Sequence, residues 1–178
     1  MKRVAFLLAA LLMLAWGLPA LAQQEDAAST VPFAYTLFEV EGVPYAYGMP
    51  QDWPQMELTQ DERAWGQIGK FQNPEGDAVA QVTLEELDLK DYPAGLTLDE
   101  LAALMKGWKG YRDVERVDIG QIPFISYAQP KEKSTGLMAM LQSGEGDVMI
   151  LHFDFVFESP DEGTAEISRQ IVGLLREK

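Results

Sequence analysis

The chain has 178 residues with 28 acidic and 14 basic side chains, a formal net charge of −14, one histidine and no cysteine. A surface of this charge repels phosphate backbones and anionic lipid, so no nucleic-acid partner and no binding to bare membrane are expected. The lack of cysteine excludes disulfides, thiol nucleophiles and thiolate metal sites.

Residues 1–22 have the pattern of a cleavable secretion signal. Lys2 and Arg3 give a positive start, and the apolar run Val4–Trp16 is short for a membrane span. Ala20-Leu21-Ala22 then places small residues where signal peptidase accepts them. We expect cleavage after Ala22 and a secreted, periplasmic or otherwise extracytoplasmic protein without stable membrane insertion; a retained anchor is the alternative. Because small secreted eukaryotic domains usually rely on disulfides, a bacterial protein is the better expectation.

Residues 23–30 are small and polar and predict a flexible leader, and residues 31–178 predict a single domain without internal repeats. Apolar and polar residues alternate in several short segments, which is typical of strands. Turn residues at Asn73–Asp77 and Gly144–Asp147 predict tight connections between neighbouring strands. The expected strands are Tyr35–Glu41, Val43–Gly48, Ala64–Phe71, Ala78–Leu84, Asp113–Ile119, Phe124–Gln129, Gly136–Gln142 and Val148–Phe157.

A first helix is predicted after Thr97, which forms a capping box with Glu100. Lys106 and Lys109 suit its last turn, and Gly110 can end it. Its expected buried stripe consists of Leu98, Leu101, Ala102, Met105 and Trp108.

A second helix is predicted after the N-cap candidate Ser159, with Pro160 at its first position and the cations Arg176 and Lys178 at its end. Its expected buried stripe consists of Ile167, Ile171, Leu174 and Leu175. Short hairpin connections favour a mostly antiparallel sheet, and each amphipathic helix needs a sheet face to cover. The predicted class is therefore an α+β sandwich with two packed helices.

Four local features together resemble the PsbP-like fold. They are the turn Pro50–Trp53 after an early strand, the capped helix Leu98–Trp108, the segment Ile119–Ile122 before paired strands, and the apolar strand Val148–Phe157 before the helix Thr164–Arg176. This α/β/α sandwich is shared by the PsbP proteins of photosystem II and by small bacterial exported proteins of the DcrB type. The resemblance implies a non-enzymatic accessory or binding domain with no shared catalytic residues, and nothing in the sequence points to a photosystem role.

His152 and Asp154 are the candidates for a polar site, because they share one face of the strand Val148–Phe157. A His–Asp pair can orient a general base, and Ser126 is the one tempting nucleophile, although no elbow motif surrounds it. The alternative is a pair without catalytic role on the less buried sheet face.

Two metal sites are also conceivable, although no metal or cofactor is predicted. Met138 and Met140 share a strand face, as thioether ligands of copper(I) would. A four-residue loop at Gly144–Asp147 would instead place them opposite Phe153 and Leu151 in the core, where methionine fills gaps. This packing role is the preferred interpretation.

A calcium site is conceivable at Asn73, Glu75 and Asp77, whose side chains alternate around a glycine. The twelve-residue calcium loop is lacking, so a plain turn is preferred.

Tyr45, Tyr47, Trp53 and Trp65 are the candidates for a partner-binding patch, because aromatic residues dominate the energetics of many interfaces. Burial in the core is the alternative, and it is favoured for the two tryptophans.

These observations predict an exported, non-enzymatic accessory or binding module that acts on an unidentified protein partner. The alternatives are a hydrolase or metal-dependent enzyme that uses His152 and Asp154, and a carrier with a small-ligand pocket between helix and sheet. The enzyme alternative requires the pair at the floor of a concave pocket, and a helix-covered face argues against it.

The secretion signal predicts that the exported protein starts at or close to Gln23, because Ala22 is the last small residue of the cleavage site. N-terminal sequencing of the exported protein checks this. Retention in membranes after a carbonate wash would contradict it.

Overall fold

The computed structural model describes residues 32–40, 42–87, 95–142, 148–158 and 162–177. The predicted signal and leader, the turn Gly144–Asp147 and the cap Ser159–Pro160 lie outside the described residues.

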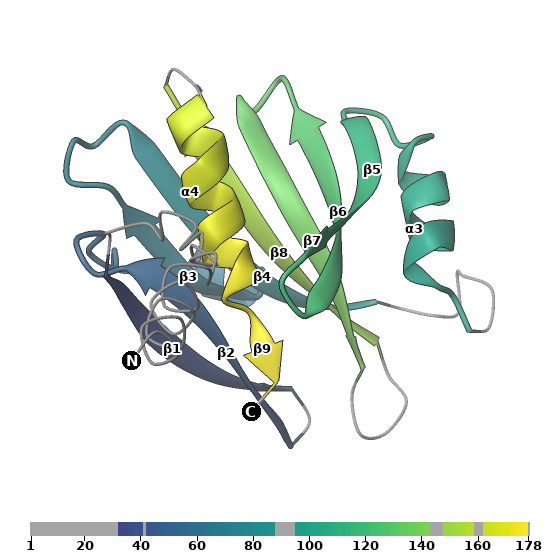
Figure 1. Ribbon diagram of the computed structural model, residues 1–178, viewed down its shortest axis with the longest axis horizontal. Coiled ribbons are helices and arrows are strands. Elements are labelled where there is room, and N and C mark those ends of the chain that lie inside the picture. The colour runs from purple at the N-terminus through teal and green to yellow at the C-terminus, as the bar shows by residue number, and fades with distance from the viewer. Residues whose placement is uncertain (1–31, 41, 88–94, 143–147, 159–161, 178) are drawn as a thin grey trace, which may run out of the picture. The chain divides into compact units, whose positions relative to one another are not determined.

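Six strands form the larger sheet, in the order β3-β4-β8-β7-β6-β5, and every neighbouring pair is antiparallel (Figure 1). Short connections join β3 to β4, β5 to β6, and β6 to β7, and the first of them contains the predicted turn Asn73–Asp77. The antiparallel α+β class expected from the sequence is therefore confirmed. The bounds are β3 Gln67–Gln72, β4 Ala78–Leu87, β5 Arg112–Ile119, β6 Ile122–Gln129, β7 Ser134–Gln142 and β8 Val148–Phe157.

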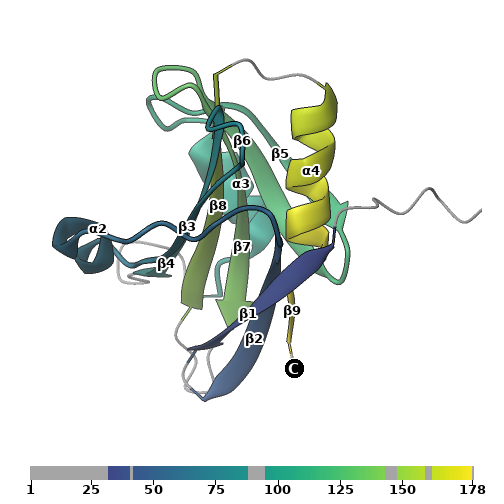
Figure 2. The same cartoon turned by 90° about the vertical axis from the view of Figure 1, so that its left-hand side faces the viewer.

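A smaller sheet of three strands has the order β1-β2-β9, with β1 at Phe33–Val40, β2 at Val43–Pro50 and β9 at Arg176–Glu177. Its inner face joins the core of the larger sheet, since Tyr47 of β2 lies edge-on to Phe71 and Phe153. Helix α4, Glu162–Gly173, closes this side through Ile171 and Val172, which are fully buried. Figure 2 shows α4 beside the strands of the larger sheet.

Strand β8 separates two cores because its side chains alternate between the faces of the sheet. Leu151, Phe153 and Phe155 are fully buried on the side of α4 and the smaller sheet. Ile150 on the opposite face belongs to a second core under helix α3, Leu98–Met105. Burial of one such side chain is worth about 1.5–3 kcal/mol, so both layers add substantially to stability.

Helix α3 begins as its sequence predicts, with a capping box. The side chain of Thr97 accepts a hydrogen bond from the backbone N–H of Glu100, and the carboxylate of Glu100 accepts one from the backbone N–H of Thr97. Leu101, Ala102 and Met105 are buried. The helix ends earlier than predicted, at Met105, and the chain continues to Gly110 in turns. The lysines at 106 and 109 therefore do not occupy its last turn.

The predicted strand Ala64–Phe71 is wrong at its start. Helix α2, Gln60–Ala64, occupies this region, and β3 begins only at Gln67. Thr59 and Glu62 form a capping box, which stabilises a helical turn against the extended conformation. The expected burial of Trp65 is also wrong, since 80% of its surface is exposed.

The predicted register of β7 against β8 is off by one residue. Met138 lies opposite His152 and Met140 opposite Ile150, instead of opposite Phe153 and Leu151. A shift by one residue moves every side chain to the other face of a sheet. Both methionines therefore lie on the side of α3, where they pack in the second core.

The predicted helical end at Arg176 is wrong as well. Helix α4 stops at Gly173, and Arg176 lies in β9, where it pairs with Ala46 of β2. Its guanidinium lies 4.6 Å from the centre of the Tyr35 ring, a cation–π contact that links β9 to β1 across β2.

Substitution of Met105 by aspartate should cost more than about 3 kcal/mol of unfolding free energy, because an unpaired charge would enter the second core. Leu104→Asp on the same helix is the control, since Leu104 is 42% exposed, and it should cost less than about 1 kcal/mol. Urea denaturation measures both. A loss below about 0.5 kcal/mol for Met105→Asp would mean that α3 does not cover the sheet.

Candidate functional site

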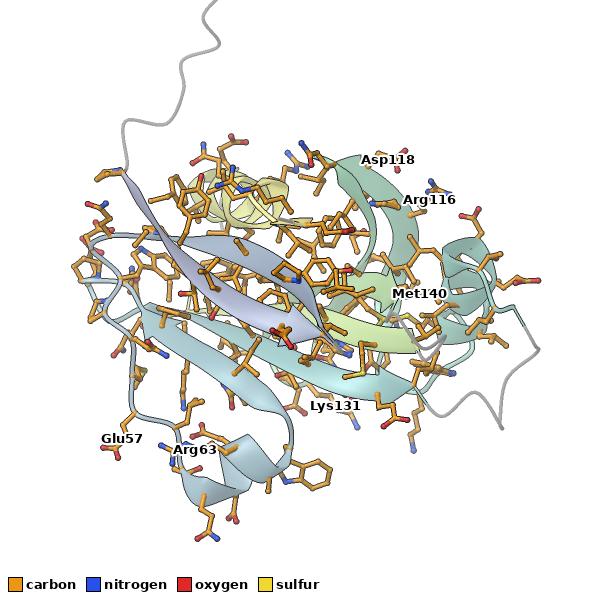
Figure 3. All side chains as sticks on the ribbon, turned by 90° about the horizontal axis from the view of Figure 1, so that it is seen from below. Glu57, Arg63, Arg116, Asp118, Lys131 and Met140 are labelled. Carbon is orange, nitrogen blue, oxygen red and sulfur yellow. The ribbon has the colours of Figure 1, made fainter. Side chains whose placement is uncertain are left out.

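Residues 59–66 form a short projection, which we call the α2 knob. It consists of the N-cap Thr59, helix α2 and the residues Trp65 and Gly66. Figure 2 shows α2 standing out from the sheets, and Figure 3, with Arg63 and Glu57 labelled, shows the same from below. The knob contributes no buried helical residue to the core.

The α2 knob is fixed to the body at its start. The carboxylate of Glu62 accepts a bond of 2.7 Å from the backbone N–H of Thr59 and forms an ion pair of 2.7 Å with Lys70 of β3. Hydrogen bonds from the Lys70 side chain and then from Thr59 lower the pKa of Glu62 to about 2. Glu62 is therefore ionised at neutral pH, and both of its bonds are charge-assisted.

The α2 knob is also fixed at its end. Gly66 has a φ of +79°, and a Cβ at this position would overlap the carbonyl oxygen of Leu84. The backbone N–H of Leu84 in turn donates to the carbonyl of Gly66 over 2.9 Å. Glycine is needed here because it alone combines this conformation with such a close approach. The backbone of Trp65 is therefore fixed on one side by the capped helix and on the other by Gly66, which is hydrogen-bonded to Leu84.

The four aromatic residues predicted as a partner patch are separated in the structure. Tyr45 and Tyr47 are 4% and 0% exposed and pack in the core between the sheets. Trp53 is partly buried against the same core. Trp65 alone of the four presents most of its ring to solvent.

His152 and Asp154 lie in a polar cluster with Tyr127 and Glu85. Tyr127 and His152 are buried and Asp154 is partly buried, whereas the side chain of Glu85 is 56% exposed. The hydroxyl of Tyr127 donates to Asp154 over 2.8 Å and lies 3.3 Å from Nδ1 of His152. The other ring nitrogen of His152, Nε2, donates to the carboxylate of Glu85 over 2.9 Å. The four side chains come from β4, β6 and β8, so the cluster ties three strands together.

Gly136 makes this cluster possible. It lies between Tyr127 and Asp154 in the strand ladder, paired with both. A Cβ at position 136 would overlap the ring of Tyr127. The missing side chain lets the phenol cross β7 and reach β8. The sequence did not point to Tyr127, because nothing in the local pattern predicts that a glycine on the neighbouring strand makes room for its ring.

Burial has the largest effect on the pKa values of Asp154 and Tyr127 in this cluster. Desolvation raises the pKa of Asp154, although the hydrogen bond from Tyr127 and the nearby His152 oppose the shift. Desolvation together with Asp154 raises the pKa of Tyr127 well above its usual value. The bond to His152 lowers the pKa of Glu85. The ring of Tyr111 lies 5.2 Å from that of Tyr127 and adds an aromatic cover.

Ser126 does not lie beside His152 and Asp154. Ser126 lies opposite Leu137, whose partner is Phe153, so its side chain is on the sheet face away from His152. Its hydroxyl instead faces the backbone carbonyl of Glu115. His152 is 9% exposed and lies on the face that α3 covers. A catalytic pair is expected at the floor of an open pocket, so a position on a helix-covered face argues against a catalytic role for His152 and Asp154.

The conceivable metal sites have structural explanations. The amide of Asn73 donates to Glu75 and Asp77, while its oxygen accepts from the backbone N–H groups of Gly76 and Ala78, which closes the hairpin. Within the described ranges, no three His, Asp or Glu side chains are grouped so that they could hold a metal ion. None of the described helices has the length and apolarity to cross a membrane.

Comparison with solved structures identifies the fold. The cyanobacterial PsbP protein CyanoP from Synechocystis sp. PCC 6803 matches with a TM-score of 0.54 and 11% identity, over 85% of this chain and 96% of that chain. LpqN, described as involved in cell envelope biogenesis of Mycobacterium tuberculosis, matches with a TM-score of 0.52 and 13% identity, over 82% and 91%. No protein-family model and no curated protein sequence matches the chain. The chain has a PsbP-like fold, as its sequence resemblance implies.

The raised pKa of Asp154 predicts how stability depends on pH. The carboxyl group of Asp154 stays protonated to higher pH in the folded state than in the unfolded state. Its contribution to the free energy of unfolding is therefore most favourable at low pH, and it declines as the pH rises through the unfolded-state pKa and then the folded-state pKa. Asp154→Asn keeps an acceptor for Tyr127 and removes the titration. Its unfolding free energy relative to the parent protein should therefore increase from about pH 4 to about pH 7.

Denaturation at several pH values measures this difference, and a constant difference would contradict the assignment. Tyr127→Phe is the matched comparison. It leaves a buried carboxylate without its donor and should cost about 1–3 kcal/mol.

Proposed function

We propose that the protein is an exported, non-enzymatic accessory module that binds a protein partner through the α2 knob, with Trp65 as the anchor. The observation that carries this proposal is the presentation of a tryptophan with 80% of its surface exposed on a segment that is held at both ends. The exposed indole contributes little to the core, and tryptophan is enriched among the residues that dominate binding energy, which supports a binding role for Trp65.

Tryptophan is suited to this role by its size and its low conformational entropy. Aromatic side chains of this class bury about 150–250 Å² when they are enclosed, and they are enriched among residues that dominate binding energy. The capping box, the Lys70 ion pair and Gly66 hold the backbone before binding. Because the backbone is already ordered before binding, less conformational entropy is lost when the complex forms.

The charge of the chain limits the class of partner. A net charge of −14 opposes association with nucleic acid and anionic lipid, which leaves a protein surface as the better match. Asp61 and Arg63 precede Trp65 on the knob, and Glu57 precedes the knob. A partner with an apolar pocket for the indole ring and a rim of basic side chains would complement this surface.

The place of action follows from the expected signal at residues 1–22, which would direct the domain out of the cytoplasm. The description of LpqN, a neighbour in fold, also concerns the cell envelope. Export and envelope association are therefore compatible with the fold, while the partner itself is proposed from the knob alone.

The polar cluster around Tyr127 supports a structural role for His152 and Asp154 in this proposal. Each hydrogen bond joins side chains from different strands, and aromatic rings cover the group. A satisfied polar network of this kind favours a single packing of the core.

Replacement of Trp65 by serine should remove partner binding and leave stability within about 0.5 kcal/mol of the parent, because the ring makes little contact with the fold. The measurement is quantitative affinity capture from the envelope of the producing cells. Leu104→Ser is the matched control, since it removes an exposed apolar side chain from α3, and it should capture the same partner as the parent protein.

The proposal fails if the parent and the Trp65→Ser protein capture the same proteins in the same amounts. It also fails if Leu104→Ser abolishes capture while Trp65→Ser preserves it, because the binding surface would then lie on α3.

A further inference from the structure

A cleft of about 320 Å³ lies between α4 and the strands β5, β6 and β7. It is on the sheet face opposite to His152, because Ser126 and Leu137 in its floor share the face of Phe153. Figure 1 shows α4 crossing this face of the sheet. The volume is at the lower end of the range for small-molecule sites in proteins, about 300–1,000 Å³.

The cleft is open because the two halves of α4 differ in how they pack. Ile171 and Val172 in the second half are fully buried and hold the helix against the core. The first half presents Ala165 to the cleft, and Ala128 on β6 faces it across the gap. These side chains are too short to meet, which leaves a hollow beside Ala165, while Ile167 in the same half of the helix packs against the core.

Strand β5 shapes the other wall through an irregularity in its ladder. The pairing with β6 shifts between Arg112 and Glu115, and Asp113 within this bulge has a φ of +52°. A side chain in this conformation is uncommon outside glycine, and bulges often re-aim side chains beside binding sites. The bulge places Asp113 and Glu115 along one rim of the cleft.

The lining chemistry restricts what can bind. Val117, Ile119 and Leu137 offer an apolar surface. Arg169 of α4 lines the cleft on the helix side, opposite the acidic side chains of β5. A ligand with an apolar body and one negative group matches the apolar surface and Arg169. A second negative charge on the ligand would be repelled by the carboxylates of Asp113 and Glu115.

We propose that this cleft is a binding site for a small organic monoanion, with the apolar body against β5 and β7 and the carboxylate or sulfonate at the guanidinium of Arg169. This site lies apart from the α2 knob and does not depend on it. Arginine suits the role because its guanidinium presents paired donors to planar and tetrahedral oxyanions.

Two fluorescent probes test the proposal on the full chain. 8-Anilinonaphthalene-1-sulfonate has an apolar body with one sulfonate, and N-phenyl-1-naphthylamine has the same body without charge. The anionic probe should bind in a 1:1 ratio. Arg169→Gln should weaken the anionic probe about tenfold and change the neutral probe less than about twofold, because only the sulfonate uses the guanidinium.

A second variant tests the location. Ala165→Leu places a larger side chain in the cleft at an exposed helix position that tolerates leucine, so it should keep the fold and weaken both probes about tenfold. Lys133→Gln removes an exposed cation outside this cleft, and Trp65→Ser removes the exposed indole of the knob; both should leave probe affinity unchanged. Thermal unfolding of each variant verifies that it is folded.

The proposal is overturned if Arg169→Gln weakens both probes equally, since the arginine would then act on packing alone. It is also overturned if folded Ala165→Leu binds as well as the parent protein, or if Trp65→Ser abolishes binding. A negative result for probe binding would not affect the proposed binding role of the α2 knob, because the capture of a protein partner and the binding of the probes are measured separately.

Discussion

Strand β8 has to be buried on both of its faces, and the arrangement of the other elements depends on this requirement. Phe153 and Phe155 are fully buried on one side and Ile150 is nearly so on the other. A sheet with two apolar faces needs a layer on each, because exposed apolar area costs about 25 cal/mol per Å². Helix α3 covers one face, while α4 and the smaller sheet share the other. The PsbP-like sandwich is the result.

The same requirement determines where function can lie. His152 and Asp154 are on a buried strand, and their polar groups are satisfied by Tyr127 of the second core and by Glu85, whose side chain is partly open to solvent. The α2 knob and the cleft beside α4, by contrast, lie where the layers do not close over the chain. Trp65 extends beyond the sandwich, and the cleft remains where the small residues of α4 stand above the sheet. Rigid layers thus position both surfaces without using them for stability.

Much of the sandwich could be predicted from periodicity and capping. The strand Val148–Phe157 has the predicted bounds, and Thr97 caps α3 as expected. These features are local, so a single segment of sequence contains all the information. The capping box of Thr59 and Glu62 was equally visible, and reading it would have identified α2 in place of a strand.

Other errors concern contacts between distant segments. The register of Met138 against His152 depends on the exact length of a connection, and one residue reverses the faces. Arg176 continues a helical pattern in sequence, yet it pairs with β2 and contacts Tyr35, far away in the chain. The exposure of Trp65 was likewise not predictable, because apolar side chains are buried by default and only the path of the knob shows otherwise.

The central claim is that this protein acts by contact through Trp65, and site-specific photo-cross-linking tests it most directly. The photoreactive residue p-benzoylphenylalanine is placed at position 65 in one sample and at position 104 in another, in cells that produce the protein. The account predicts one dominant adduct with a second protein at position 65 and none of that mass at position 104. Equal adducts at both positions, or an adduct at position 104 alone, would contradict it.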